Sequence, residues 1–340
     1  MKKFLSIALA IVMVVGVVFL VGCGNKTEEP KDDTPATAET LKFGMGVVAS
    51  YGEVKDATDE ANGEGEVVVD IAAVTVDADG KIVKCALDCA DSKAQFTADG
   101  KAVEATEFKT KYELGDDYNM VAYGGAKAEW YAQADAFAKL VEGKTIDEVK
   151  ALMAEDYKGT EDVVNAGCTI YVSGFVKAIE EAVKNAKDSA ATADSTLKLG
   201  VVTSQSNKDA SEEANGEIEI STTVVATALD AEGKVIVAST DTAAAKLAFD
   251  TKGASATDTT AALLTKYQQG NDYNMVAYGG AKLEWYAQAD AFSGLLAGKT
   301  ADEIGALAAE DGKGVADVQT AGCTIYVTDF VKAAVKAATK

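Results

Sequence analysis

The 340-residue chain contains no histidine, and all of its 32 basic residues are lysines because arginine is also absent. Without histidine, Ser-His-Asp and Cys-His nucleophile systems and imidazole metal sites are excluded. Without arginine, bidentate clamps on phosphates or carboxylates are excluded too. The formal net charge of −22 argues against a nucleic-acid partner, which needs a basic surface. We therefore do not expect an enzyme that relies on the common side-chain acid–base chemistry.

The N-terminus has the pattern of a secretory signal. Lys2 and Lys3 precede an apolar or small-residue run over residues 4–22, which a retained membrane anchor would also explain. The run ends in Leu-Val-Gly-Cys, which resembles a bacterial lipobox. We expect residues 1–22 to be a lipoprotein signal peptide and Cys23 to carry the lipid, which would hold the protein on the extracellular face of the cytoplasmic membrane. Removal of two lysines and no acid changes the net charge from −22 to −24.

Proline is scarce and confined to one segment. The two prolines, Pro30 and Pro35, both lie in the polar and charged stretch that follows Cys23. Such a composition does not bury enough apolar surface to order itself. Residues 23–40 are therefore predicted to be a lipidated, disordered tether.

Beyond the tether, the sequence repeats itself. Residues 118–137 read YNMVAYGGAKAEWYAQADAF, and residues 273–292 differ from them only at Leu283, which replaces Ala128. The heptapeptide AGCTIYV also occurs twice, 155 residues apart. These matches predict two homologous tandem domains. Their expected limits are residues 41–187 for repeat 1, 188–195 for a linker and 196–340 for repeat 2.

Each repeat is predicted to place strands before helices. Apolar, β-branched runs joined at Asp79-Gly80 predict a hairpin. A helical period begins at Ala126, and a second helix is expected after Thr145, whose capping box Glu148 completes. The run CTIYV predicts a strand, followed by a last helix capped by Ser173. The fold class is therefore α+β, with two domains that each contain a mainly antiparallel sheet followed by packed helices.

The cysteine positions do not indicate a disulfide or a metal site. Cys85 and Cys89 lie on one face of a predicted strand, too far apart for a disulfide. Cys168 and Cys323 occur once per repeat, with no histidine or second cysteine to complete a metal site. We expect these four cysteines to pack in the core and expect no metal.

The threonines of the repeated heptapeptide carry a resemblance. Ala-Gly-Cys-Thr, which ends at Thr169 and again at Thr324, is similar to the flavinylation motif of FMN-binding domains. With the lipobox, the acidic tether and the tandem repeats, nearly the whole mature chain resembles the flavinylated lipoproteins of Gram-positive extracellular electron transfer (PplA-like proteins). Asp162 and Asp317 correspond to the upstream aspartate of that motif, each one position further from its threonine.

The resemblance implies FMN joined by a phosphoester to Thr169 and to Thr324, two per chain, installed by a flavinyltransferase. It also implies a membrane quinol-linked dehydrogenase as electron donor and a soluble or mineral electron acceptor. Further residues are predicted to bind the cofactor. They are the motif residues Gly167, Cys168, Gly322 and Cys323; the glycine pairs Gly124-Gly125 and Gly279-Gly280 at expected helix starts; Lys127 and Lys282, which would offset phosphate charge; and the aromatic residues Tyr123, Trp130, Tyr278 and Trp285.

Other interpretations of these residues stay open from the sequence. The glycine pairs are equally consistent with tight turns, and the aromatic residues with a core cluster. For the whole chain, the first hypothesis is an electron carrier rather than an enzyme with its own substrate. Its alternatives are a surface lipoprotein that binds a small ligand or peptide without a covalent cofactor, and an adhesion or spacer repeat.

Overall fold

The computed structural model describes residues 39–105 and 107–339. These residues form one compact unit of α+β architecture, with two antiparallel sheets and packed helices. The predicted signal peptide, the lipid site at Cys23 and nearly all of the predicted tether lie outside the described residues. Within the described part of the chain, no helix is long and apolar enough to cross a membrane.

Repeat 1 begins with three long strands and ends with helices. The strands are β1 (Lys42–Lys55), β2 (Gly63–Val76) and β3 (Ile82–Phe96), followed by the short β4 (Ala102–Val103). The helices are α1 (Lys111–Leu114), the 3-10 helix η1 (Gly115–Tyr118), α2 (Trp130–Val141), α3 (Ile146–Lys150), α4 (Glu161–Ala166) and α5 (Ser173–Lys184).

Repeat 2 follows the same order after the short strand β5 (Lys187–Asp188). Its strands are β6 (Thr196–Lys208), β7 (Gly216–Leu229) and β8 (Val235–Phe249). Its helices are α6 (Lys266–Gln269), the 3-10 helix η2 (Gly270–Tyr273), α7 (Trp285–Leu295), α8 (Ala301–Gly305), α9 (Ala316–Ala321) and α10 (Thr328–Thr339).

The strands form two antiparallel sheets, in which β1–β4 and β6–β8 are meanders and β5 returns to the free edge of β1. The first sheet has the order β4-β3-β2-β1-β5, and the second has the order β6-β7-β8. The predicted hairpin is confirmed, because β2 and β3 flank a turn at Gly80, which has a positive φ. The capping box of Thr145 and Glu148 at the start of α3 is confirmed as well.

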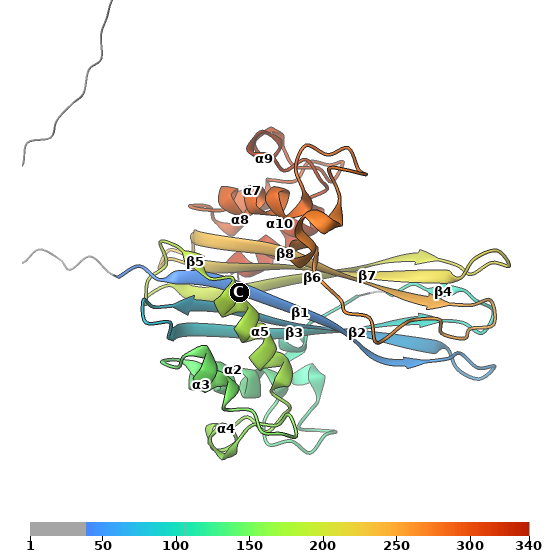
Figure 1. Ribbon diagram of the computed structural model, residues 1–340, viewed down its shortest axis with the longest axis horizontal. Coiled ribbons are helices and arrows are strands. Elements are labelled where there is room, and N and C mark those ends of the chain that lie inside the picture. The colour runs from blue at the N-terminus through green and yellow to red at the C-terminus, as the bar shows by residue number, and fades with distance from the viewer. Residues whose placement is uncertain (1–38, 106, 340) are drawn as a thin grey trace, which may run out of the picture. The chain divides into compact units, whose positions relative to one another are not determined.

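The sheets lie face to face, and each has its helices on the other side (Figure 1). One layer of buried side chains, which includes Val69, Ile71, Ile218 and Ile220, is shared by the two sheets. Each outer sheet face packs against the helices of its own repeat. Side chains alternate between the two faces of a strand, and both faces are buried over residues 71–76 of β2 and 222–229 of β7. These stretches therefore lack the polar alternation that the first half of each strand shows.

The repeats pair through a pseudo-two-fold arrangement. Phe96 and Phe249, which are equivalent residues, stack with ring centroids 4.7 Å apart and planes inclined by 3°. Two equivalent backbone hydrogen bonds cross between the repeats: Ala57 N–H donates to the Gly253 carbonyl at 2.7 Å, and Ala210 N–H to the Gly100 carbonyl at 2.9 Å. Such reciprocal contacts are the mark of an isologous interface, here formed within one chain.

Three local predictions are wrong. Helix α2 begins at Trp130, four residues after Ala126, because residues 121–124 form a turn. Residues 168–172 form no strand: they run irregularly between α4 and α5, with a single bridge from Tyr171 to Lys158. Ser173 is the first residue of α5 rather than its cap, and Val172 at the cap position makes no side-chain bond.

Candidate functional site

Thr169 and Thr324 occupy equivalent, exposed positions just after a short helix. In repeat 1, α4 ends at Gly167, which has a φ of 106°. A positive φ is easily reached by glycine, so Gly167 turns the chain sharply out of the helix. The next residue, Cys168, is fully buried and anchors the turn, whereas Thr169 is exposed. In the Gly-Cys-Thr sequence, the glycine therefore makes the turn, the cysteine packs in the core and the threonine exposes its hydroxyl.

A buried glutamine holds each threonine. The Gln133 Oε1 atom accepts hydrogen bonds from the Thr169 N–H at 2.8 Å and from the Thr169 Oγ1 hydroxyl at 3.0 Å. Gln288 makes the same two bonds to Thr324, at 2.8 and 3.1 Å. Each glutamine side chain is only 1% exposed. Because the hydroxyl proton points inward, the threonine oxygen presents its lone pairs outward.

The same glutamine ties the threonine to the segment over residues 119–129. The Gln133 Nε2 group donates to the Ala128 carbonyl at 2.8 Å. The segment is held from its other side by Glu129, whose carboxylate accepts from the N–H groups of Met120 at 2.8 Å and Val121 at 3.0 Å. Gln133 thus satisfies its own buried polar atoms, as burial requires, and couples two surface segments.

The glycine pairs are tight turns. A Cβ atom on Gly124 would lie 2.6 Å from the Met120 carbonyl oxygen, and Gly125 has a φ of 65°. Gly279 and Gly280 repeat both features. Since α2 begins at Trp130 and α7 at Trp285, the helix start predicted at each glycine pair is wrong.

A cavity of about 330 Å³ lies beside Thr324. The two residues that follow this threonine belong to its lining, and hydroxyl groups from β7 and β8 form part of its floor. Its volume is near the lower end of the range for small-molecule pockets. The Lys266 ammonium lies 5.5 Å from the Tyr273 ring centroid and 5.9 Å from that of Trp285. The lining also includes the Asp329 carboxylate, together with Met275, Ile325 and Tyr326.

The corresponding region of repeat 1 carries more charge. Asp70 stands where repeat 2 has Thr223, and its carboxylate packs against Gly174 in the first turn of α5. Lys111, the counterpart of Lys266, forms a salt bridge of 3.3 Å with Asp91. Burial raises the pKa of Asp70, and the nearby Lys111 only partly opposes this. The two threonines are held alike, but their surroundings differ electrostatically.

The tryptophans belong to the core, with one edge near the site in repeat 2. Trp130 is 4% exposed and contacts Phe175 edge-on, with centroids 5.5 Å apart. Trp285 makes the same contact with Phe330 at 5.6 Å and also lines the cavity. Of the aromatic residues predicted to bind the cofactor, Tyr123 and the equivalent Tyr278 are instead almost fully exposed.

The other predicted residues surround the threonines without bonding to them. Asp162 and Asp317 are exposed in the first turns of α4 and α9, each at the far end of its helix from the threonine. Lys127 and Lys282 are exposed and form no salt bridge in the part of the chain that the structure describes. Cys323 is buried like Cys168 and follows Gly322, which is the cap of α9.

Cys89, Cys168 and Cys323 pack in the core as predicted, whereas Cys85 is only half-buried. Cys85, Cys89, Cys168 and Cys323 are free thiols. Burial raises the pKa of Cys168 and of Cys323 to about 11, so both stay protonated at neutral pH and are poor nucleophiles. Over residues 39–105 and 107–339, no group of three or more possible ligands could hold a metal ion.

Comparisons do not extend this description. No protein-family model, curated protein or solved structure matches the chain. Its function must therefore be inferred from its own residues.

The sequence analysis did not identify the two glutamines that hold the threonines, although a signal existed. Gln133 lies on the same helical face as Trp130, Ala134 and Phe137, where a polar residue needs a partner.

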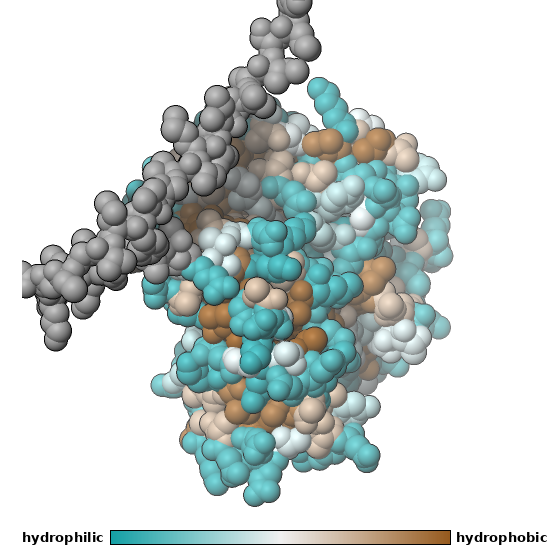
Figure 2. Space-filling view, turned by 60° about the vertical axis from the view of Figure 1, so that its left-hand side comes forward, coloured by the Kyte–Doolittle hydropathy of each residue, from teal (hydrophilic) through white to brown (hydrophobic). Residues whose placement is uncertain are grey.

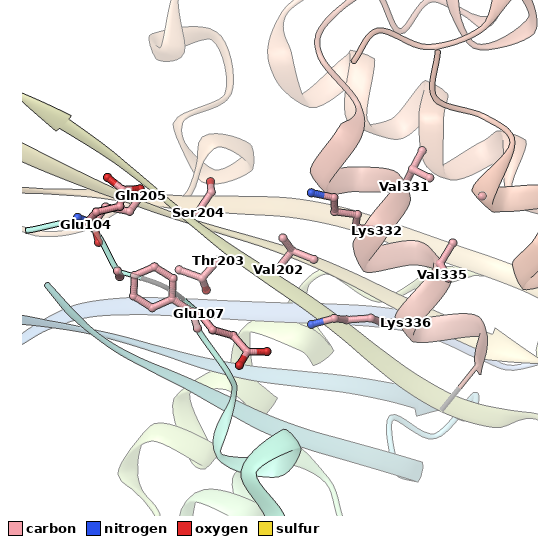
Figure 3. Close-up of a pocket in the computed structure, with 13 residues that line it drawn as sticks. Glu104, Glu107, Val202, Thr203, Ser204, Gln205, Val331, Lys332, Val335 and Lys336 are labelled. Carbon is pink, nitrogen blue, oxygen red and sulfur yellow. The ribbon is translucent and has the colours of Figure 1, made fainter. Parts of the chain in front are cut away.

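Another cavity lies away from both threonines. It measures about 660 Å³ and lies between β6 and α10, with Lys332 and Lys336 extending from the helix (Figure 3). The Lys336 ammonium is already engaged, because it bonds the Glu113 carboxylate and the Val201 carbonyl, both at 2.8 Å. On the face shown in Figure 2, hydrophilic side chains predominate and apolar patches are smaller.

Proposed function

We propose that the protein is a membrane-anchored extracellular electron carrier with FMN joined by a phosphoester to Thr169 and to Thr324. It would receive electrons from a quinol-linked dehydrogenase of the membrane and pass them to external acceptors. The observation that carries the proposal is the paired threonine–glutamine arrangement. Two exposed hydroxyls, in equivalent positions, are each oriented by a hydrogen bond to a buried glutamine.

The residues around Thr324 fit such a group. Thr324 presents its oxygen at the surface, next to a cavity whose wall includes the Tyr273 ring and an edge of Trp285. Planar rings pack well against such aromatic faces. The lining carries one ammonium, Lys266, and one carboxylate, Asp329, so an added phosphate would be stabilised where it lies nearer to the ammonium than to the carboxylate. When bound, FMN would supply reversible one- and two-electron chemistry, and Thr169 and Thr324 would hold it in place.

Covalent attachment of FMN would use the outward-facing oxygen of each threonine hydroxyl. The threonine oxygen would form a bond to the phosphorus of the FMN half of FAD, the pyrophosphate bond would break, and AMP would leave. The hydroxyl proton would pass to a base of the transferase, since the Gln133 amide is not basic. After the reaction, the Thr169 N–H still donates to Gln133, so the modified residue keeps its position.

Intact-mass analysis tests the proposal. The full chain is co-expressed with a flavinyltransferase, beside Thr169→Ala, Thr324→Ala and the double variant. We expect two FMN additions in the wild type, one in each single variant and none in the double variant. Thr169→Ser, which keeps a hydroxyl, is the matched control and should retain two. An unmodified wild-type chain, with the transferase active on another substrate, refutes the proposal and favours the ligand-binding alternative.

A further inference from the structure

An exposed loop beside each threonine is nearly identical in the two repeats. The two segments, residues 119–129 and 274–284, differ at a single position, and we call them the tyrosine loops. Elsewhere the repeats have diverged even in their interior, since Val69 of the shared core corresponds to Thr222, and both are buried. Because buried positions have changed, the constancy of an exposed loop requires a reason other than core packing.

The same backbone hydrogen bonds hold each tyrosine loop in one conformation. In repeat 1, the Tyr123 N–H donates to the Asn119 carbonyl at 3.0 Å. The Ala126 N–H donates to the Met120 carbonyl at 3.2 Å, and the corresponding bonds of repeat 2 have the same lengths. The Glu129 carboxylate, which bonds two N–H groups at the start of the loop, adds a further constraint. These bonds fix the loop without using the tyrosine side chain.

The aromatic side chain of each tyrosine loop lies almost entirely in solvent. Tyr123 is 89% exposed and Tyr278 is 90% exposed, and the neighbouring Val121 is 44% exposed. A tyrosine offers a large contact area and loses little conformational entropy on binding, and tyrosines are enriched among the residues that dominate protein interfaces. A tyrosine presented on a fixed loop is therefore well suited to contact a partner protein.

The tyrosine loops adjoin the turns that carry the threonines. Gln133 bonds both the Ala128 carbonyl at the end of the loop and the N–H of Thr169. In repeat 2, a Cβ atom on Gly322 would lie 3.1 Å from the Leu283 Cδ1 atom, so the loop packs directly against the turn before the threonine. A protein that reaches either threonine oxygen therefore meets the loop beside it.

The presence of this surface in both repeats indicates which partner it serves. An electron donor and an electron acceptor each need to approach only one of the two cofactors, and neither has to contact a threonine. The enzyme that attaches FMN must bring phosphorus within bonding reach of both hydroxyls, so it contacts the surface around each of them. Among the proposed partners, it is the one that requires the same docking surface twice.

We propose that the tyrosine loops are docking surfaces for the flavinyltransferase, with Tyr123 and Tyr278 as their main contacts. Each loop directs the enzyme to the threonine of its own repeat. This inference rests on the proposed function, because it requires FMN to be attached to both threonines. It goes beyond that function by placing part of the recognition outside the Ala-Gly-Cys-Thr motif.

The loading rates of the two threonines within one molecule test the proposal. The full chain, purified without FMN, is incubated with FAD and the transferase, and FMN addition is followed on the Lys-C peptide that contains each threonine. We expect Tyr123→Ser to slow loading of Thr169 by about tenfold, a loss typical of a truncated interface hot spot, and to leave loading of Thr324 unchanged. Tyr278→Ser should show the reverse. Tyr123→Phe keeps the aromatic ring and should load at nearly the wild-type rate.

A second measurement separates docking from chemistry. The transferase, without FAD, is titrated with the chain that carries Thr169→Ala and Thr324→Ala, which cannot be modified. Adding Tyr123→Ser and Tyr278→Ser to this chain should weaken binding by about tenfold. Leu264→Ser, at a side chain that is 53% exposed outside the loops, is the matched control and should change neither binding nor loading.

The outcomes distinguish the docking proposal from the proposed function. A wild-type chain that is loaded at both threonines, with unchanged rates and binding in the tyrosine variants, would overturn the docking proposal alone. A wild-type chain that takes up no FMN from a transferase active on another substrate would refute both. Tyrosine variants that alter the sedimentation of the chain by itself would assign the loops to self-association and also overturn the docking proposal.

Discussion

Asp241 makes the stability of the fold depend on pH in an unusual direction. Its carboxylate is 7% exposed and accepts hydrogen bonds from the N–H groups of Thr242 at 2.6 Å and Tyr267 at 3.1 Å. Burial raises the pKa of Asp241 from 3.8 to about 7, which outweighs the opposing effect of bonds from Thr265, Thr242 and Tyr267. Between these two values, the unfolded chain is ionised while the folded chain keeps its proton.

The sign and size of the effect follow by linkage. The folded state binds more protons than the unfolded state in this window, so the contribution of Asp241 to stability falls as pH rises. It is fully present below about pH 4 and is lost as pH rises through about 7. A shift of this size corresponds to roughly 4 kcal/mol in total, of which about 2–3 kcal/mol falls between pH 5 and pH 8.

The Asp241→Asn substitution removes the contribution of Asp241 ionisation to the free energy of unfolding. Asparagine keeps an acceptor oxygen for the Thr242 and Tyr267 N–H groups, but it cannot ionise. We expect the variant to gain about 2–3 kcal/mol relative to the wild type between pH 5 and pH 8. The assay is urea unfolding at each pH, with the exposed Asp194→Asn as control. A stability difference that stays constant over this range would refute the reasoning.

Two further substitutions test how the site and the packing are built. Gln133→Leu should lower FMN occupancy of Thr169 several-fold and leave the matching threonine of repeat 2 loaded, as measured by mass spectrometry of Lys-C peptides; equal loss at both positions would contradict a local role. Gly200→Ala would place a Cβ atom against the Ala333 carbonyl oxygen and should destabilise the fold by about 3 kcal/mol in urea unfolding. Its control, Gly294→Ala in α7, meets nothing and should stabilise by about 0.5–1 kcal/mol; similar effects of the two would contradict the packing argument.

Local signals in the sequence predicted most elements correctly. The Asp79-Gly80 turn and the capping box at Thr145 each depend on bonds between neighbouring residues, so a short window contains their cause. The run at residues 168–172 misled because a short apolar stretch with β-branched residues does not by itself distinguish a strand from a buried connection. Cys168 and Val172 are apolar since they anchor that connection in the core.

The candidate site was only half predictable. Thr169 and Thr324 follow from the repeated motif, which is a property of the sequence alone. Their glutamine partners lie 36 residues earlier, and only folding brings them together. The polar residue at position 133, within an otherwise apolar helix face, indicated that a hydrogen-bond partner was needed. The sequence did not indicate which residue that partner is.

By itself, the sequence determined that the chain has two copies of one α+β unit, because repetition and strand and helix periods are local properties. Only the tertiary structure decided how those copies meet. The apolar inner faces of β2 and β7 could pack against any complementary apolar surface. Their sequences do not specify that this surface is the other repeat. Packing of Phe96 on Phe249 and the reciprocal bonds at Gly100 and Gly253 select the pseudo-two-fold pairing, since burial depends on which surfaces fit together.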